Sequence, residues 1–115
     1  MEVNIKFYPF VYLNKSNASY ISKKALRLLD ISIDEEFIDF YIVPEKKLCF
    51  IYKKPIAGIP LVFNANLFKF SATEKIRRIF QVYDIPTNDY RLIIDDEPLV
   101  INDTKYFPLI KLPLL

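Results

Sequence analysis

The sequence has no histidine and no tryptophan, and only one glycine and one cysteine. Without histidine, the chain cannot form a Ser–His or Cys–His nucleophile pair or an imidazole metal site. With Gly58 as its single glycine, it cannot form a glycine-rich phosphate loop. Nor do carboxylates converge at an informative spacing. We therefore expect a protein that is not an enzyme and has no catalytic residue, no cofactor and no metal site.

The single cysteine cannot form an internal disulfide, and long apolar runs are missing. Cys49 lies in the apolar run Leu48–Ile51, which indicates a buried, unreactive strand cysteine and fits a reducing compartment. No apolar run approaches the roughly 18 residues that a membrane-spanning helix needs. The opening Met1-Glu2-Val3-Asn4 does not resemble a signal peptide. We expect a cytoplasmic protein with no membrane partner.

What the chain does contain is apolar and aromatic material. Its 115 residues are 52% hydrophobic and include ten Phe and eight Tyr, which predicts one folded domain with one core. Sixteen basic residues against 14 acidic ones leave a net charge of +2. Because that charge is small, an argument for nucleic-acid binding has to rest on clustering of the basic residues.

Hydrophobic periodicity predicts a small β-rich α+β domain. The first half should contain a strand over 3–13 (bent or at a sheet edge because of Pro9), a polar turn over 14–19, a helix within 20–30 capped by Ser19 or Ser22, and a hairpin of 37–43 and 48–52. The second half should contain an extended stretch over 61–70, a helix over 72–84 opened by a Ser71–Glu74 capping box, a hairpin of 90–94 and 99–102 around the turn 95–98, and an apolar edge segment from Tyr106.

The two halves repeat one pattern 54 positions apart. Lys23-Lys24 aligns with Arg77-Arg78, and Asp30-Ile31 aligns with Asp84-Ile85. The apolar helix positions between these pairs also match. We interpret the chain as two degenerate copies of a β-α-β-hairpin unit, over about 1–55 and 59–115, joined at 56–60.

The unit resembles a known family, the AbrB/MazE-like swapped-hairpin domain of bacterial transition-state regulators and antitoxins. The residues that carry the resemblance are Ile21, Ser22, Lys23, Leu29 and Ile31, with the hairpin over 37–52. The family usually has glycine where this chain has Asp30, and it usually supplies one copy per chain, so that two chains interlock to bind DNA. The resemblance implies a swapped-hairpin barrel, built here by a monomeric pseudo-dimer or by a homodimer, that binds duplex DNA.

Basic residues on the two helices are the best candidates for a binding site: Lys23, Lys24, Arg27, Arg77 and Arg78. Repetition of the basic pair would place two positive patches about a pseudo-twofold axis, and such patches attract phosphates. The alternative is an ordinary solvated helix face. The further lysines Lys46, Lys47, Lys53 and Lys54 flank a strand, and we interpret them first as protection of a sheet edge.

Two other features have structural explanations. Asp95-Asp96-Glu97 precedes Pro98 between apolar runs, which favours a turn over a metal or acid–base site. The aromatic rings could stack on single-stranded bases, and Tyr8, Tyr12, Tyr41 and Tyr52 suit an interface. Their alternation along strands nevertheless favours the core for most of them.

The repeated basic pairs favour a non-enzymatic nucleic-acid-binding protein, and the resemblance implies a transcriptional regulator or antitoxin-like module. The alternative is a small protein–protein adaptor or inhibitor from a phage or mobile element. That alternative rests on the nearly neutral charge and on the apolar C-terminal tail, which could dock on a partner protein.

Overall fold

The computed structural model describes residues 7–16, 18–32 and 36–112. Its helices are α1 (Lys23–Leu28) and α2 (Thr73–Val82), with a short 3-10 turn η2 (Pro44–Lys46). Its strands are β1 (Phe10–Asn14), β2 (Ser19–Ile21), β3 (Phe37–Val43), β4 (Leu48–Lys54), β5 (Ile59–Pro60), β6 (Val62–Asn64), β7 (Leu67–Phe70), β8 (Asp89–Ile94), β9 (Leu99–Ile101) and β10 (Thr104–Ile110). Both helices lie where the sequence predicted them.

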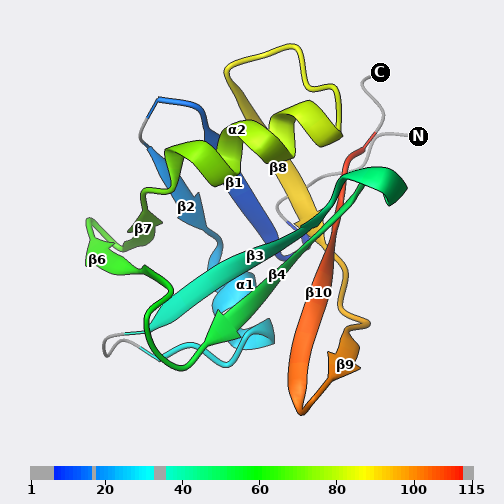
Figure 1. Cartoon of the computed structure of the whole chain (residues 1–115). Helices are drawn as coiled ribbons and strands as arrows, with labels where there is room; N and C mark the ends of the chain where they lie inside the picture. The colour runs from blue at the N-terminus through cyan, green and yellow to red at the C-terminus, as the bar shows by residue number, and fades with distance from the viewer. Residues whose placement is uncertain (1–6, 17, 33–35, 113–115) are drawn as a thin grey trace.

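The strands form one antiparallel sheet that nearly closes into a barrel (Figure 1). Their order is β5-β3-β4-β10-β8-β1-β2-β7-β6, with β9 beside β10. The first and last strands of this order, β5 and β6, are separated in the chain only by Leu61. One extended segment therefore supplies both ends of the sheet. The protein is a small, compact, β-rich domain in which two helices pack on a barrel-like sheet.

The two halves of the chain share an order of two strands, a helix and two further strands, and the second half has β5 and β9 in addition. The first half runs β1, β2, α1, β3, β4, and the second runs β6, β7, α2, β8 and β10, with β9 between the last two. Strands of one half pair with strands of the other in four places: β1 with β8, β2 with β7, β3 with β5, and β4 with β10. Neither half closes the sheet by itself.

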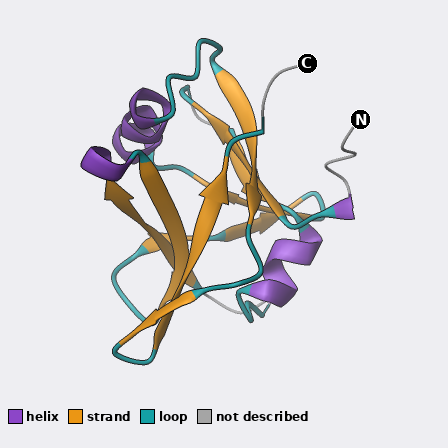
Figure 2. Ribbon diagram, turned by 90° about the vertical axis from the view of Figure 1, so that its right-hand side faces the viewer, coloured by secondary structure: helices purple, strands orange, loops and turns teal. Residues whose placement is uncertain are grey.

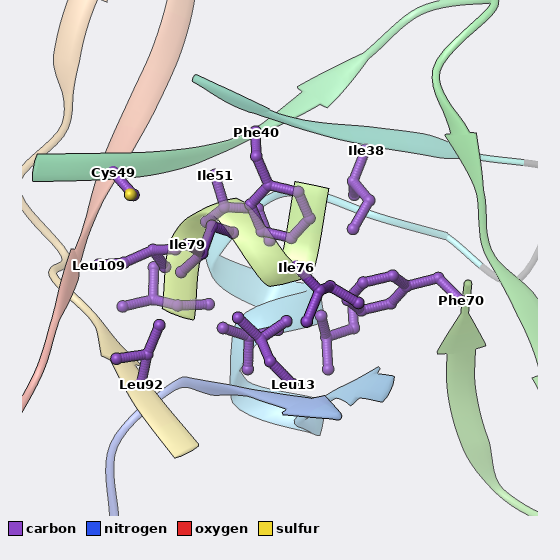
Figure 3. Packing of buried hydrophobic residues seen from close by; sticks show 14 of the residues in the cluster. Leu13, Ile38, Phe40, Cys49, Ile51, Phe70, Ile76, Ile79, Leu92 and Leu109 are labelled. Carbon is purple, nitrogen blue, oxygen red and sulfur yellow. The ribbon is translucent and has the colours of Figure 1, made fainter. Parts of the chain in front are cut away.

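The core lies inside the barrel, where alternate strand residues meet the buried side of α2 (Figure 3). Ile76, Ile79 and Phe80 of α2 are almost fully buried, and the helix packs against β1, β3 and β4. Figure 3 shows Leu13, Phe40, Ile51, Leu92 and Leu109 around Ile76 and Ile79. On α1, Ala25 and Leu29 are buried in the same cluster. Within the described residues, no helix is long and apolar enough to cross a membrane.

The N-cap was predicted correctly for α1 and wrongly for α2. Ser22 caps α1, because its Oγ accepts from the N–H of Ala25 (3.2 Å) and also from the N–H of Phe10 (3.0 Å). The three residues before it form β2 and not part of a turn or helix. The predicted capping box places Ser71 at the N-cap of α2, but the N-cap is Ala72, which makes no side-chain cap bond. Packing of its apolar side therefore fixes α2 more than its cap does.

Two segments predicted at sheet edges lie inside the sheet. Strand β1 runs between β8 and β2, and Pro9 comes just before it, accepting from the N–H of Ile94 (2.8 Å). The apolar tail forms β10, which runs between β4 and β8 and buries Phe107 and Leu109. The tail thus docks on its own chain as far as the described residues extend; 113–115 lie outside them. The edge position is therefore wrong for the tail, and it is the wrong one of the two alternatives given for 3–13, an edge or a bend at Pro9; residues 3–6 lie outside the described residues. Strand partners are not encoded locally.

The second hairpin differs from its prediction. Strand β9 pairs with β10, not with β8, around a turn at Asn102-Asp103, where both residues have positive φ (50° and 65°). Between the pairs Ile94–Leu109 and Leu99–Tyr106, residues 95–98 oppose only 107 and 108. The acidic segment is therefore a bulge in one long interrupted strand, and not the hairpin turn that we predicted.

The stretch 61–70 is not one extended segment but the β6–β7 hairpin. Its two turn residues, Ala65 and Asn66, both have positive φ (52° and 64°). This is the conformation of a tight two-residue hairpin turn. No glycine marks the turn in the sequence, so the local signal for it was weak.

Candidate nucleic-acid interface

Helix α1 exposes the three cations that were predicted for it: Lys23, Lys24 and Arg27. They are exposed because Ala25 and Leu29 occupy the buried side of the helix. Lys24 Nζ donates to the carbonyl oxygen of Phe7 (2.6 Å) and lies 5.8 Å from the centre of the Phe7 ring. Lys23 and Arg27 form no ion pair with any described residue. The α1 patch therefore has two unpaired cations beside one tethered lysine.

Helix α2 exposes Arg77 and Arg78, whereas Ile76, Ile79 and Phe80 of the same helix are buried. Arg77 lines an open cavity of about 470 Å³ together with Lys15, whose Nζ lies 5.2 Å from the centre of the Phe80 ring. The other lining residues are Phe80, Gln81, Asp84, Ile85 and Pro86. Two cations thus face one carboxylate, and this excess of positive charge suits a single anionic group such as a phosphate.

The two helices lie on opposite sides of the barrel (Figures 1 and 2). The structure therefore gathers the predicted residues into two separate groups, Lys23, Lys24 and Arg27 on α1, and Arg77 and Arg78 on α2. It does not bring the two basic pairs onto one face. A single flat ligand cannot contact both groups at once, so each helix has to be considered as its own surface.

The lysines around β4 have other roles than those predicted. Strand β4 runs between β3 and β10, so protection of a sheet edge is wrong for it. Lys53 pairs with Glu36 (3.4 Å) and Lys54 pairs with Asp39 (3.4 Å). Only the Lys46-Lys47 pair, in and after the η2 turn, is exposed and outside the ion pairs of the described residues.

Asp39 is a buried carboxylate that our sequence reasoning missed. Only 7% of the residue is exposed, and it binds Lys75 of α2, Lys54 of β4 and the N–H of Phe40. Burial alone would raise the pKa of Asp39, but these hydrogen bonds and the charge of Lys75 outweigh it and hold the pKa below its ordinary value. A lone acid inside the apolar strand 37–43 was the available signal. With its charge satisfied, Asp39 ties α2 to the sheet.

Cys49 is fully buried, as the sequence predicted. Burial raises the pKa of its thiol to about 11, although the Tyr83 hydroxyl and the charge of Arg78 act in the opposite direction. The Tyr83 hydroxyl also accepts from the N–H of Cys49 (2.9 Å) and donates to the carbonyl oxygen of Leu109 (2.7 Å). It thereby bridges β4 and β10 where their ladder of backbone bonds ends. A thiol in this state is structural and not a nucleophile.

The aromatic residues divide by type. Six phenylalanines are buried: Phe40, Phe50, Phe68, Phe70, Phe80 and Phe107. None of the eight tyrosines is fully buried, although Tyr83 and Tyr90 are half-buried and pack against the core. The core prediction therefore holds for many phenylalanines and only in part for the tyrosines. A phenolic hydroxyl needs water or a polar partner, which keeps tyrosine at the boundary of a core. Tyr41 and Tyr8 are exposed, while Tyr12 and Tyr52 are half-buried.

Comparison with known proteins finds no relative of this chain. No protein-family model, no curated protein and no solved structure matches the chain.

Proposed function

We propose that this protein binds nucleic acid without catalysing a reaction, and that the cations of its two helices make the contacts. The observation that carries the proposal is a contrast between two sets of cations. Lys53, Lys54 and Lys75 form ion pairs with carboxylates. No ion pair within the described part of the chain involves Lys23, Lys24, Arg27, Arg77 or Arg78. Unpaired, exposed cations attract phosphates and release their condensed counterions.

The kind of nucleic-acid-binding protein that we propose follows from the resemblance of the repeated unit to a known family. We propose that the halves are degenerate copies of a unit similar to the AbrB/MazE-like swapped-hairpin domain, combined in one chain as a pseudo-dimer. Their common order of elements supports this, as does the pairing of strands between halves. Asp30 supplies a second support, because its φ of 56° is one that glycine adopts most readily, and the family usually has glycine there. A transcriptional regulator or antitoxin-like module is the corresponding function.

The arrangement of the helices shapes the test. Because α1 and α2 lie on opposite sides of the barrel, a straight duplex segment contacts one helix at a time. The double variants Lys23→Ala/Lys24→Ala and Arg77→Ala/Arg78→Ala therefore probe each surface separately. A matched control is Lys46→Ala/Lys47→Ala, which removes the same charge from an exposed turn.

The experiment is a salt titration of duplex DNA affinity for the wild type and the three double variants. Each phosphate contact contributes about −0.9 to the slope of log K against log salt. A double variant should therefore flatten the slope by about 1.8 where both residues touch phosphate, and the control should leave it unchanged. Equal slopes for all four proteins would remove the helices from the interface. Absence of wild-type affinity at low salt would end the duplex-binding proposal.

A protein–protein adaptor or inhibitor is the second candidate function, and one observation favours it. Leu99, Val100 and Ile101 of β9 are 51%, 57% and 45% exposed, and β9 pairs only with β10 among the described strands. An exposed apolar edge of this kind can accept a strand from another protein. Retention on heparin that salt abolishes favours nucleic acid, whereas flow-through favours the adaptor.

A further inference from the structure

Five neighbouring strands align five side chains in one row across the sheet. Arg91 on β8 lies opposite Tyr12 on β1, and Tyr12 lies opposite Tyr20 on β2. Tyr20 lies opposite Lys69 on β7, and Lys69 lies opposite Val62 on β6. Residues directly opposite each other in an antiparallel pair share one face. The row thus places two tyrosines between two cations.

The row faces outward from the barrel. Val11, Leu13 and Ile21 alternate with the tyrosines along β1 and β2, and they are 0%, 0% and 1% exposed. Since successive strand residues point to opposite faces, the tyrosines point away from the core. All five members of the row keep exposed surface. Figure 1 shows β1, β2, β7 and β6 following one another across this part of the sheet.

The rings are held close together. The Tyr12 and Tyr20 ring centres are 5.0 Å apart with 32° between the planes, and Phe10 adds a third ring 6.2 Å from Tyr20. The guanidinium of Arg91 lies 5.3 Å from the centre of the Tyr12 ring and 5.8 Å from that of Phe10. The Tyr12 hydroxyl donates to Asp89 of β8 (2.8 Å), which ties the ring to the neighbouring strand. The surface is therefore an ordered aromatic platform.

The cations at its two ends suit a ligand that is both flat and anionic. Strands lie about 4.8 Å apart, so three strand spacings put Arg91 and Lys69 about 14 Å from each other. Neither forms an ion pair within the described residues. Tyr12 contacts one acidic residue, Asp89. The two cations Arg91 and Lys69 therefore outnumber the carboxylate that is bonded to this platform.

We infer that the outer face of β8-β1-β2-β7 binds single-stranded nucleic acid. Unstacked bases lie on the Tyr12 and Tyr20 rings, and the phosphates on either side reach Arg91 and Lys69. Stacking on aromatic side chains within a basic surface is the physical basis of single-strand binding. A duplex offers no free base faces to these rings, because its bases stack on each other. An apolar protein partner gains nothing from a cation at each end.

This inference goes beyond the proposed function, because it uses residues of the sheet and not of the helices. Its probes are fluorescein-labelled oligo(dT) and oligo(rU) of about 12 nucleotides, within the usual site size, and a duplex of the same length. Tyr12→Leu/Tyr20→Leu should weaken single-strand binding about 5-fold or more for each base that loses its stacking partner. Tyr12→Phe keeps the ring and should retain affinity.

A second variant does not depend on the rings. Arg91→Gln/Lys69→Gln should flatten the salt dependence of single-strand affinity by about 1.4 if both residues touch phosphate. The control is Tyr41→Leu/Tyr106→Leu, a ring pair 5.9 Å apart on β3 and β10, which should change nothing. Thermal unfolding of each variant identifies those that fail to fold.

The outcomes separate the two proposals. Weak single-strand binding by the row variants with unchanged duplex binding supports the inference, even if the helix variants show no duplex effect. Single-strand affinity that persists in both row variants overturns it, as does an equal loss in the Tyr41/Tyr106 control. Wild-type protein that binds neither oligonucleotide at low salt also overturns it.

Discussion

Asp30 and Asp84 occupy the same position in the turn that ends helix α1 and helix α2, 54 residues apart. Each has positive φ, 56° and 51°, and each is followed by an isoleucine whose N–H reaches back into the helix. Ile31 donates to Leu26 (2.8 Å) and Ile85 donates to Phe80 (3.0 Å). Both ends are Schellman motifs with aspartate in the left-handed position. The sequence alignment of Asp30-Ile31 with Asp84-Ile85 thus coincides with a shared backbone geometry.

Asp30→Gly and Asp84→Gly should each stabilise the protein by up to about 1 kcal/mol, because glycine adopts the left-handed conformation without steric cost. Asp30→Val and Asp84→Val should destabilise it, since a β-branched residue is strained there. Urea unfolding of the four variants measures both effects. Glycine variants that are less stable than the wild type at both positions would contradict this account of the helix ends.

Tyr83→Phe should destabilise the protein by about 2–4 kcal/mol, because the N–H of Cys49 and the carbonyl of Leu109 would each lose a buried partner. Tyr41→Phe is the matched control: Tyr41 is 52% exposed, so its change should stay within about 0.5 kcal/mol. Denaturant unfolding gives the energies, and amide exchange at Cys49 should accelerate in the Tyr83 variant alone. Equal stability of the two variants would show that the bridge between β4 and β10 contributes little.

Stability should fall in acid because of Asp39. Its pKa in the folded protein is below the ordinary value of 3.8. The carboxylate therefore stabilises the fold above about pH 4, and this contribution is lost as the pH falls through the folded pKa. Asp39→Asn should be less stable than the wild type at neutral pH, and its stability should change less between about pH 4 and pH 2. Asp96→Asn, at an exposed carboxyl, is the control. Parallel pH curves for the wild type and Asp39→Asn would exclude this role.

Gly58→Ala should destabilise the protein by about 1–3 kcal/mol, a typical cost of overpacking. A Cβ on Gly58 would lie 2.7 Å from the Ile38 carbonyl oxygen and 3.1 Å from the Phe37 Cβ, so backbone has to move. The neighbouring change Ala57→Gly should be neutral or stabilising by up to about 1 kcal/mol, because Ala57 has a φ of 58°. Thermal unfolding compares the pair, and a neutral Gly58→Ala would mean that the joint between the halves adapts freely.

The sequence by itself determined the elements that depend on neighbours along the chain. Helices α1 and α2 follow from their apolar periodicity, and Ser22 was identified as a possible cap from its type and place. The β3–β4 hairpin follows from two apolar runs around a short turn at 44–47. The burial of Cys49 follows from its apolar surroundings. Each of these features is stabilised mainly within a few residues, so local composition was enough to predict it.

Only the tertiary structure decided which strands pair and what their pairing brings together. It put β10 between β4 and β8, although an apolar, proline-bearing tail looked like an edge. It joined Asp39 to Lys75, 36 residues away, and it aligned Arg91, Tyr12 and Tyr20 across three strands. It also set the two basic helices on opposite sides of the barrel. The physical reason is that the backbone N–H and C=O groups of a strand form their hydrogen bonds with a neighbouring strand, which can come from anywhere in the chain. No local pattern in the sequence specifies which segment that neighbour is.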